Sequence, residues 1–346
     1  MTRETRCRNG SLAPPRHPYP TPTPMMKKLF AAVLLSISSA AAVAVPFGSQ
    51  SVLVVEDDTG KVLLEKNASA VVPIASLTKL MTAMVVLDAK QDMNELIEID
   101  RSDVDTLKHS SSRVPVGASI PRGDVLQLAL MSSDNRAAAS LGRTYPGGLP
   151  AFKEAVRRKI AALGMSNTVI EEPTGLSPHN RSTAADLVKM ANAASKYKEI
   201  TDRTTDAKNL ISINSREVEF HNTNRLVGAK GWDIGLSKTG YIQEAGRCLI
   251  MSIKAGGKNA TMVLLNAGAS SARIMDALNI RRFINGESPA AAPAPRAIAK
   301  ASSRAPRIKA SAGRVKVKAK ASSRSKSKVV VAPKKKKAVV TRKRRN

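Results

Sequence analysis

Residues 73–82 are Pro-Ile-Ala-Ser-Leu-Thr-Lys-Leu-Met-Thr, and they open a segment whose apolar residues recur at helical spacing. This spacing predicts a buried helix over Ser76–Ala89. Ser76 and Lys79 are three residues apart at the start of the helix, so their side chains share one face. A helix start also presents free backbone N–H groups. A nucleophile, a candidate base and hydrogen-bond donors are therefore combined in one turn.

The expected chemistry of this turn depends on the protonation of Lys79. A serine hydroxyl is a weak nucleophile until a base removes its proton, and a lysine is a base only when its amine is neutral. Lowering a lysine pKa from about 10.4 to about 7 costs roughly 4–5 kcal/mol. Burial and a neighbouring cation both lower the pKa. We therefore expect Lys79 to be buried, with Lys238 as the candidate second cation.

Two further motifs follow, Ser133-Asp134-Asn135 and Lys238-Thr239-Gly240. Each is weak alone, and S-x-x-K itself recurs at Ser195–Lys198. Together they supply the remaining groups that an acyl transfer needs. Ser133 and Asn135 follow a predicted helix at Val125–Met131 on a short loop. There they are candidates to pass a proton to a leaving amine and to bind a substrate amide.

The third motif falls in a predicted strand, Gly235–Tyr241. Lys238 and Thr239 are candidates to hold a substrate carboxylate. Gly240 would let a substrate backbone approach the strand closely. The backbone N–H of Tyr241 is a candidate to form an oxyanion hole with the N–H of Ser76.

Signatures of several other enzyme classes are missing from the sequence. It contains no H-E-x-x-H, no paired cysteines for a metal, no Walker A loop and no G-x-S-x-G elbow. We expect neither a metal nor a cofactor. Cys248 lies in an apolar run and is expected to be a buried, inert thiol.

The order of the predicted elements indicates the fold class. Two strands forming a hairpin, Ser51–Glu56 and Lys61–Glu65, begin the globular part. Three strands and a helix end the globular part, namely the strands Gly235–Tyr241, Arg247–Ala255 and Thr261–Asn266 and the helix Ser271–Phe283. Further helices, including Pro150–Leu163 and Ala184–Tyr197, lie in the middle. We predict an α/β (α+β) fold with one antiparallel sheet built from both ends, covered by helices, and an inserted all-helical region.

The formal charge of +29 is concentrated outside this globular part. Of that charge, +20 lies in residues 291–346 and +5 in residues 1–44, which leaves +4 for residues 45–290. Residues 287–346 are rich in Ala, Pro, Lys and Arg, and we expect a disordered basic tail. Such a tail is either a solvated linker or a segment that binds polyanions.

The N-terminal region predicts export. Residues 25–44 have the basic start, the apolar run and the small-x-small end of a cleaved signal peptide, although a membrane anchor is the alternative. Residues 1–24 precede this signal, which indicates a wrongly assigned start at Met1. We therefore predict a catalytic domain at residues 45–286, in an exported, periplasmic protein, with the tail contacting an anionic wall or outer-membrane surface rather than nucleic acid.

The three motifs in this order resemble the superfamily of penicillin-binding proteins and serine β-lactamases. The sequence is most similar to the low-molecular-mass penicillin-binding proteins, which are D-alanyl-D-alanine carboxypeptidases and endopeptidases. The resemblance spans about Ser51–Phe283 and is carried by residues 73–82, residues 130–138, Pro173–Ser177, Asn222–Leu226 and Ser237–Tyr241.

This resemblance implies a function and a role for each residue. Ser76 is the acylated nucleophile and Lys79 the proton acceptor, Ser133 and Asn135 complete the proton relay and the substrate contact, and Lys238 binds substrate. The implied fold is a β-lactamase/transpeptidase-like sheet covered by helices. The implied substrate is the D-alanyl stem peptide of peptidoglycan, with β-lactam antibiotics as covalent inhibitors.

Four functions remain open at this point. No strand-like segment follows the last predicted helix, which resembles the shorter endopeptidase branch of the family and favours cleavage of stem-peptide cross-links. A carboxypeptidase that trims pentapeptide stems would use the same motifs. A β-lactamase is the third reading, but neither Glu171 nor Glu172 is followed by the E-x-x-L-N pattern of class A enzymes. A non-enzymatic polyanion-binding protein is the fourth.

Overall fold

The computed structural model of the chain describes residues 47–288. The predicted N-terminal extension (residues 1–24), the signal peptide (residues 25–44) and all but the start of the basic tail (residues 287–346) lie outside the described residues. None of the helices within the described range is long and apolar enough to cross a membrane.

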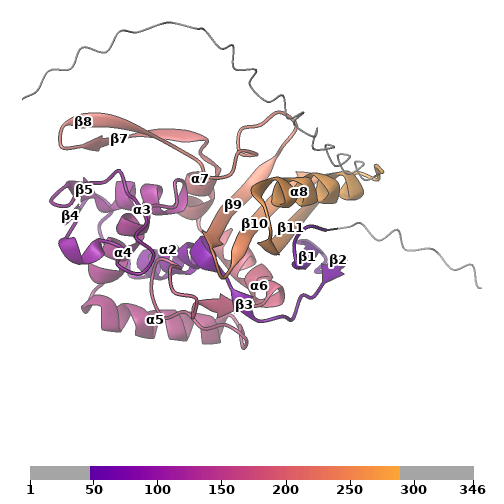
Figure 1. Ribbon diagram of the computed structural model, residues 1–346, viewed down its shortest axis with the longest axis horizontal. Helices are drawn as coiled ribbons and strands as arrows, with labels where there is room; N and C mark the ends of the chain where they lie inside the picture. Colours follow the sequence, from indigo (N-terminus) through magenta and orange to yellow (C-terminus); the bar gives the residue numbers. More distant parts are fainter. Residues whose placement is uncertain (1–46, 289–346) are drawn as a thin grey trace, which may run out of the picture. The chain divides into compact units, whose positions relative to one another are not determined.

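An antiparallel sheet built from both ends of the described chain forms the centre of the fold (Figure 1). Its strands are β1 (Ser51–Glu56), β2 (Val62–Lys66), β9 (Ile234–Ile242), β10 (Gly246–Ala255) and β11 (Lys258–Ala267). They are ordered β2-β1-β11-β10-β9, and β1 pairs with β11 so that Ser51 lies opposite Leu265. The predicted sheet topology is therefore confirmed, and β9, which carries the Lys238 motif, is an edge strand.

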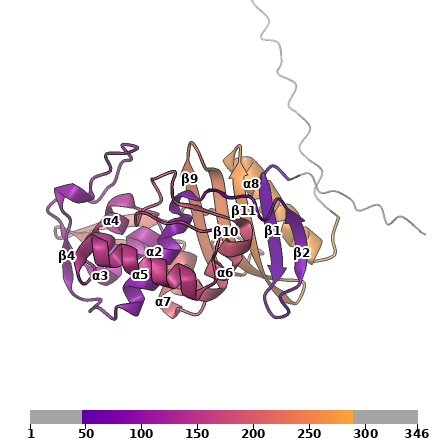
Figure 2. The same ribbon diagram turned by 90° about the horizontal axis from the view of Figure 1, so that it is seen from below.

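Both faces of the sheet are covered by helices (Figure 2). On one face, Leu249 and Met251 of β10 share a buried cluster with residues of α8 (Ser270–Ile284). Ile250 between them points to the opposite face and belongs to the larger cluster, which includes α6 (Ala184–Ala194). Because successive side chains of a strand alternate between faces, a strand covered on both sides becomes a continuous apolar run.

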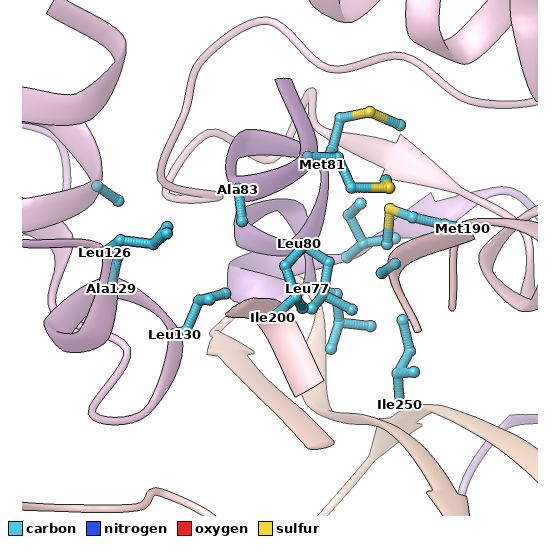
Figure 3. Packing of buried hydrophobic residues seen from close by; sticks show 14 of the residues in the cluster. Leu77, Leu80, Met81, Ala83, Leu126, Ala129, Leu130, Met190, Ile200 and Ile250 are labelled. Atoms are coloured by element: carbon cyan, nitrogen blue, oxygen red, sulfur yellow. The ribbon is translucent and has the colours of Figure 1, made fainter. Parts of the chain in front are cut away.

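The inserted region is mainly helical, as predicted, and it packs around one central helix. Nine of the eleven residues of that helix, α2 (Thr78–Asp88), are buried. Figure 3 shows Leu80 and Ala83 of α2 among Leu126 and Leu130 of a neighbouring helix. The helices around α2 are α3 (Arg122–Leu130), α4 (Asn135–Arg143), α5 (Gly148–Ala162) and α7 (Lys198–Thr205).

Short elements connect this region to the sheet. There are two short 3-10 helices among the described residues, η1 (Ala75–Leu77) and η2 (Arg101–Asp103). There are also two short antiparallel strand pairs, β3 (Val72–Pro73) with β6 (Arg181–Ser182) and β4 (Leu96–Glu98) with β5 (Ser119–Pro121). The 3-10 turn η1 leads directly into α2, so Ser76 lies in this turn and not in the α-helix itself.

The structure differs from the sequence expectation in two further places. The helix predicted to reach Tyr197 ends at Ala194, and the short helix α7 follows. Between α7 and β9, where no element was predicted, the chain forms a hairpin of β7 (Lys208–Ile213) and β8 (Arg216–His221). Its two short strands interrupt the apolar residues with exposed polar and charged ones, which gives a weak strand signal.

Candidate active site

Ser76 lies where the sheet meets the helical region. It is half-buried in the 3-10 turn before α2, and the preceding residue Ala75 has a φ of +49°. An alanine held at positive φ is strained backbone, which persists where the surrounding contacts over-determine it. The Ser76 hydroxyl accepts a hydrogen bond from Lys79 Nζ at 2.9 Å.

Lys79 is almost completely buried, with 1% of its surface exposed. Its ammonium nitrogen donates to three acceptors, namely Ser76 Oγ at 2.9 Å, Asn135 Oδ1 at 2.7 Å and the carbonyl oxygen of Thr174 at 2.7 Å. Burial lowers the pKa of Lys79 to about 8, although the carboxylates of Glu172, Asp134 and Asp105 oppose the shift. A substantial fraction of Lys79 is thus neutral near physiological pH.

Lys238 and Ser133 form the second half of the site. Lys238 Nζ donates to Ser133 Oγ at 2.8 Å and to the carbonyl oxygen of Thr239 at 3.1 Å. Burial lowers the pKa of Lys238 well below its ordinary value, and the positive charges of Lys79 and Arg273 lower it further. Two buried amines that share a small site cannot both carry a proton cheaply.

The loop that carries Ser133 is fixed by its neighbours. Ser133 has a φ of +59°, and Asp134 caps α4 by accepting from the N–H of Ala137 at 2.9 Å. Asn135 was predicted to lie in this loop, but it is the first residue of α4. The reason is that Asp134 is the N-cap, so the helix begins at the residue directly after it. Ser112 Oγ donates to the other oxygen of Asp134 at 2.7 Å.

The third motif lies along β9, as predicted, beside Ser76. The hydroxyl of Thr239 is 2.6 Å from that of Thr223. A Cβ atom on Gly240 would lie 3.1 Å from the backbone nitrogen of Ser76, so only glycine allows this approach without displacement. The side chain of Tyr241 is 52% exposed and stacks with Arg247 at 3.6 Å.

Two groups that the sequence analysis left without a role support the site. Glu172 accepts hydrogen bonds at 2.7 Å from the backbone nitrogens of Thr174 and Gly175, and at 3.0 Å from Asn180 Nδ2. Its carboxylate thereby holds the loop that presents the Thr174 carbonyl to Lys79. The signal in the sequence is the Thr-Gly pair within Pro173–Ser177, since Gly175 has a φ of +85°.

The other unassigned group is a serine in the loop before β5. Asn135 Nδ2 donates to Ser110 Oγ at 2.8 Å, and this hydroxyl donates to Asp105 at 2.7 Å. These bonds orient the Asn135 amide so that its oxygen faces Lys79. No motif marks Ser110, because its partner Asn135 is 25 residues away in the chain.

The arrangement is that of a serine acyl-transfer enzyme with a lysine base. A family comparison gives the same class: the model of peptidase S11, described as D-alanyl-D-alanine carboxypeptidase, matches residues 38–269. This chain belongs to that family of serine peptidases.

Curated relatives narrow the comparison. A D-alanyl-D-alanine endopeptidase of Pseudomonas aeruginosa is 45% identical over 248 residues, which cover 71% of this chain and 80% of the relative. A D-alanyl-D-alanine endopeptidase of Escherichia coli K12 is 42% identical, with coverage of 68% and 77%. Both matches span most of each protein.

Solved structures share the fold. The Streptomyces K15 DD-transpeptidase has a TM-score of 0.66 at 24% identity, covering 70% of this chain and 98% of that one. Penicillin-binding protein D2 from Listeria monocytogenes, in the ampicillin-bound form, has a TM-score of 0.60 at 27% identity, with coverage of 70% and 98%. The predicted β-lactamase/transpeptidase-like fold is confirmed.

Replacing Gly175 with alanine should misplace the nucleophile. The new Cβ would lie 2.0 Å from the carbonyl oxygen of Ala75 and 2.8 Å from the nitrogen of Ser76, so one of the two segments must move. A displacement of this kind is expected to slow acylation by penicillin about 100-fold. The matched control is Gly60→Ala, which has a φ of +69° and nothing within 4 Å of the new Cβ. A folded Gly175→Ala protein that acylates at the wild-type rate would contradict this account.

The acylation rate should follow the titration of Lys79. Lys79 is the candidate base and would act through its neutral amine, so the second-order rate constant for a fluorescent penicillin should rise with pH through about 8. The rate constant at pH 7 should be about one tenth of its limiting value at high pH, because about one tenth of a base with a pKa of about 8 is neutral at pH 7. Lys79→Arg should remove both the activity and the rise. A profile that is flat from pH 6 to 9 would refute the role of Lys79.

Proposed function

We propose that this chain is a serine D-alanyl-D-alanine endopeptidase that cleaves stem-peptide cross-links of peptidoglycan through an acyl-enzyme on Ser76. The observation that carries the proposal is the 2.9 Å hydrogen bond between Ser76 Oγ and a buried Lys79. Family membership and the two relatives named endopeptidases support the choice of substrate.

Acylation begins with the transfer of the Ser76 proton to neutral Lys79. Ser76 Oγ then forms a bond to the carbonyl carbon of the D-alanine residue before the scissile amide. The negative charge moves to the carbonyl oxygen, for which the N–H groups of Ser76 and Tyr241 are the proposed donors. The close approach of Gly240 to Ser76 supports this placement, because Tyr241 follows Gly240 on β9.

The amide bond breaks when its nitrogen receives a proton. Ser133 is the proposed donor, since its hydroxyl lies 2.8 Å from Lys238 Nζ, from which it can recover the proton. The leaving amine departs and the ester on Ser76 remains. The proton that Lys79 took from Ser76 replaces the one that Lys238 gave up, so the net transfer is from Ser76 to the leaving amine and Lys79 is neutral again. A water molecule then attacks the ester while Lys79 takes its proton, and this proton passes to Ser76 Oγ as the ester bond breaks.

Substrate contacts complete the proposed roles. Asn135 uses one N–H of its amide group for Ser110, which leaves the other to bind a substrate carbonyl. Lys238 and Thr239 are the proposed carboxylate site, and Thr223 belongs to it through its 2.6 Å contact with Thr239. β-lactam antibiotics, which have a carboxylate beside a strained amide, would acylate Ser76 by the same route.

The alternatives are separated by particular features. A carboxypeptidase would use the same site, and only the size of the leaving group differs. A β-lactamase needs a carboxylate that is free to activate water, whereas Glu172 already accepts bonds from Thr174, Gly175 and Asn180. We therefore expect the penicilloyl ester on Ser76 to be hydrolysed slowly. Polyanion binding would reside in the basic tail, outside the described residues.

Localisation remains part of the proposal. Peptidoglycan peptides lie outside the cytoplasmic membrane, so residues 25–44 are proposed to act as an export signal and residues 45–286 as the periplasmic catalytic domain. The tail at residues 287–346 is proposed to hold the enzyme at an anionic wall or outer-membrane surface.

Ser76→Ala should abolish two activities at once, namely cleavage of purified cross-linked muropeptide dimers and stable labelling by fluorescent penicillin. Ser195→Ala is the matched control, because Ser195 also begins an S-x-x-K sequence but is exposed at the end of α6. Mass spectrometry should find dimers converted to monomers by the wild type. Conversion of pentapeptides to tetrapeptides without dimer cleavage would select the carboxypeptidase instead. Dimer cleavage by Ser76→Ala would refute the mechanism.

A further inference from the structure

A groove with a volume of about 500 Å³ opens beside Ser133. Its walls come from three segments that are far apart in the sequence: the loop before β5, the loop between α3 and α4, and the end of β8. The lining includes Ser112, Arg113, Ser133, Asp134, Phe220 and His221. No step of the proposed acyl transfer uses Arg113, Phe220 or His221.

The position of the groove relates it to the leaving group. Ser133 is the proposed proton donor to the leaving nitrogen, so the chain attached to that nitrogen starts next to Ser133. The leaving group of a carboxypeptidase is a single amino acid, which ends there. The leaving group of an endopeptidase is a whole stem peptide, which needs further room. The groove that contains Ser133 supplies that room.

Arg113 gives the groove a fixed positive charge. Its guanidinium lies 4.0 Å from the ring centre of Phe220, and its Nη1 donates to the carbonyl oxygen of Glu219 at 2.9 Å. Phe220 is only 2% exposed and belongs to the larger buried cluster, so its ring is held in place. Stacking on a buried ring and one backbone bond hold the guanidinium in place while its other donors remain available.

The acidic groups near Arg113 are committed to other partners. Asp134 accepts from Ala137 N and from Ser112 Oγ. The Glu219 carboxylate contacts Lys208 at 3.0 Å and His221 at 3.2 Å. Within residues 47–288, Arg113 makes no ion pair with a carboxylate. An arginine arranged in this way is suited to binding a carboxylate from outside the chain.

We propose that this groove binds the leaving strand of the cross-link and that Arg113 pairs with a carboxylate of that strand. The inference rests on the proposed endopeptidase function and names the subsite that accommodates a peptide in place of a single D-alanine. The ligand is a stem peptide with free carboxylates, which is anionic at neutral pH.

The test compares the wild type with three variants on matched substrates. Arg113→Gln should lower kcat/KM for cross-linked muropeptide dimers about tenfold, as expected for the loss of one charge-assisted hydrogen bond. Arg113→Lys keeps the charge without the planar fork and should lose about threefold. The control is Arg216→Gln. Arg216 is an exposed arginine at the start of β8, the strand that carries Phe220, and it lies outside the groove, so kcat/KM of this variant should equal that of the wild type.

A second substrate isolates the carboxylate. This substrate is a dimer in which the carboxyl groups of the leaving strand are converted to amides, except for the carboxyl group next to the scissile bond. On it, the kcat/KM values of wild type and Arg113→Gln should differ less than twofold. Equal rates for wild type and Arg113→Gln on the unmodified dimer would overturn the proposal. A tenfold loss that persists on the amidated dimer would also overturn the pairing with a carboxylate.

Penicillin acylation separates this inference from the proposed function. Penicillin has no leaving strand, so all three Arg113 and Arg216 variants should be labelled at the wild-type rate. A slower label in Arg113→Gln would mean that the substitution disturbs the Ser133 loop, and the subsite would be rejected. If wild type itself labels with penicillin but does not cleave dimers, the endopeptidase function fails and the subsite fails with it.

Discussion

The burial of the Lys79 amine is the constraint on which the rest of the structure depends. A charge removed from water is costly unless hydrogen bonds replace its hydration. Here the three acceptors come from three separate segments: Ser76 before α2, Asn135 at the start of α4, and the Thr174 carbonyl in the loop held by Glu172. The helical region and the sheet must therefore pack correctly before the amine is satisfied. The same burial that demands these partners lowers the pKa of Lys79 and suits its amine to the proposed role of base.

Positive charge is concentrated at this site even though residues 45–290 carry a net charge of only +4. Lys238 lies buried on edge strand β9, and Arg273 of α8 reaches the carbonyl oxygen of Cys248 at 3.1 Å from the other side of the sheet. Burial, and after it repulsion from Lys79 and Arg273, lowers the pKa of Lys238, so the site is held in an arrangement that is unfavourable in itself. The apolar clusters on both faces of the sheet offset that cost.

The sequence predicted those parts of the fold and the site that are marked by a periodic apolar pattern or by a short motif. The hairpin at Ser51, the strands after Gly235, five of the helices and the convergence of three motifs could be derived, because apolar alternation and spacing act locally. The helices α4 and α7 were not predicted. The roles of Glu172 and Ser110 could not, since each depends on a partner brought close only by the fold. The β7–β8 hairpin, and with it the ring on which Arg113 stacks, was also missed, because its strands are mostly exposed and mix charged with apolar residues.

The proposed acyl-transfer site determines how the bond breaks, and the groove beside Ser133 is proposed to determine how large a leaving group fits. Cleavage in either case depends on the amine of Lys79 being neutral often enough to act. The most direct measurement is an NMR titration of protein labelled with carbon-13 at the lysine Cε, with Lys79→Arg used to assign the signal. We expect Lys79 to titrate with a midpoint near 8. A midpoint near the ordinary value of 10.5 would contradict it.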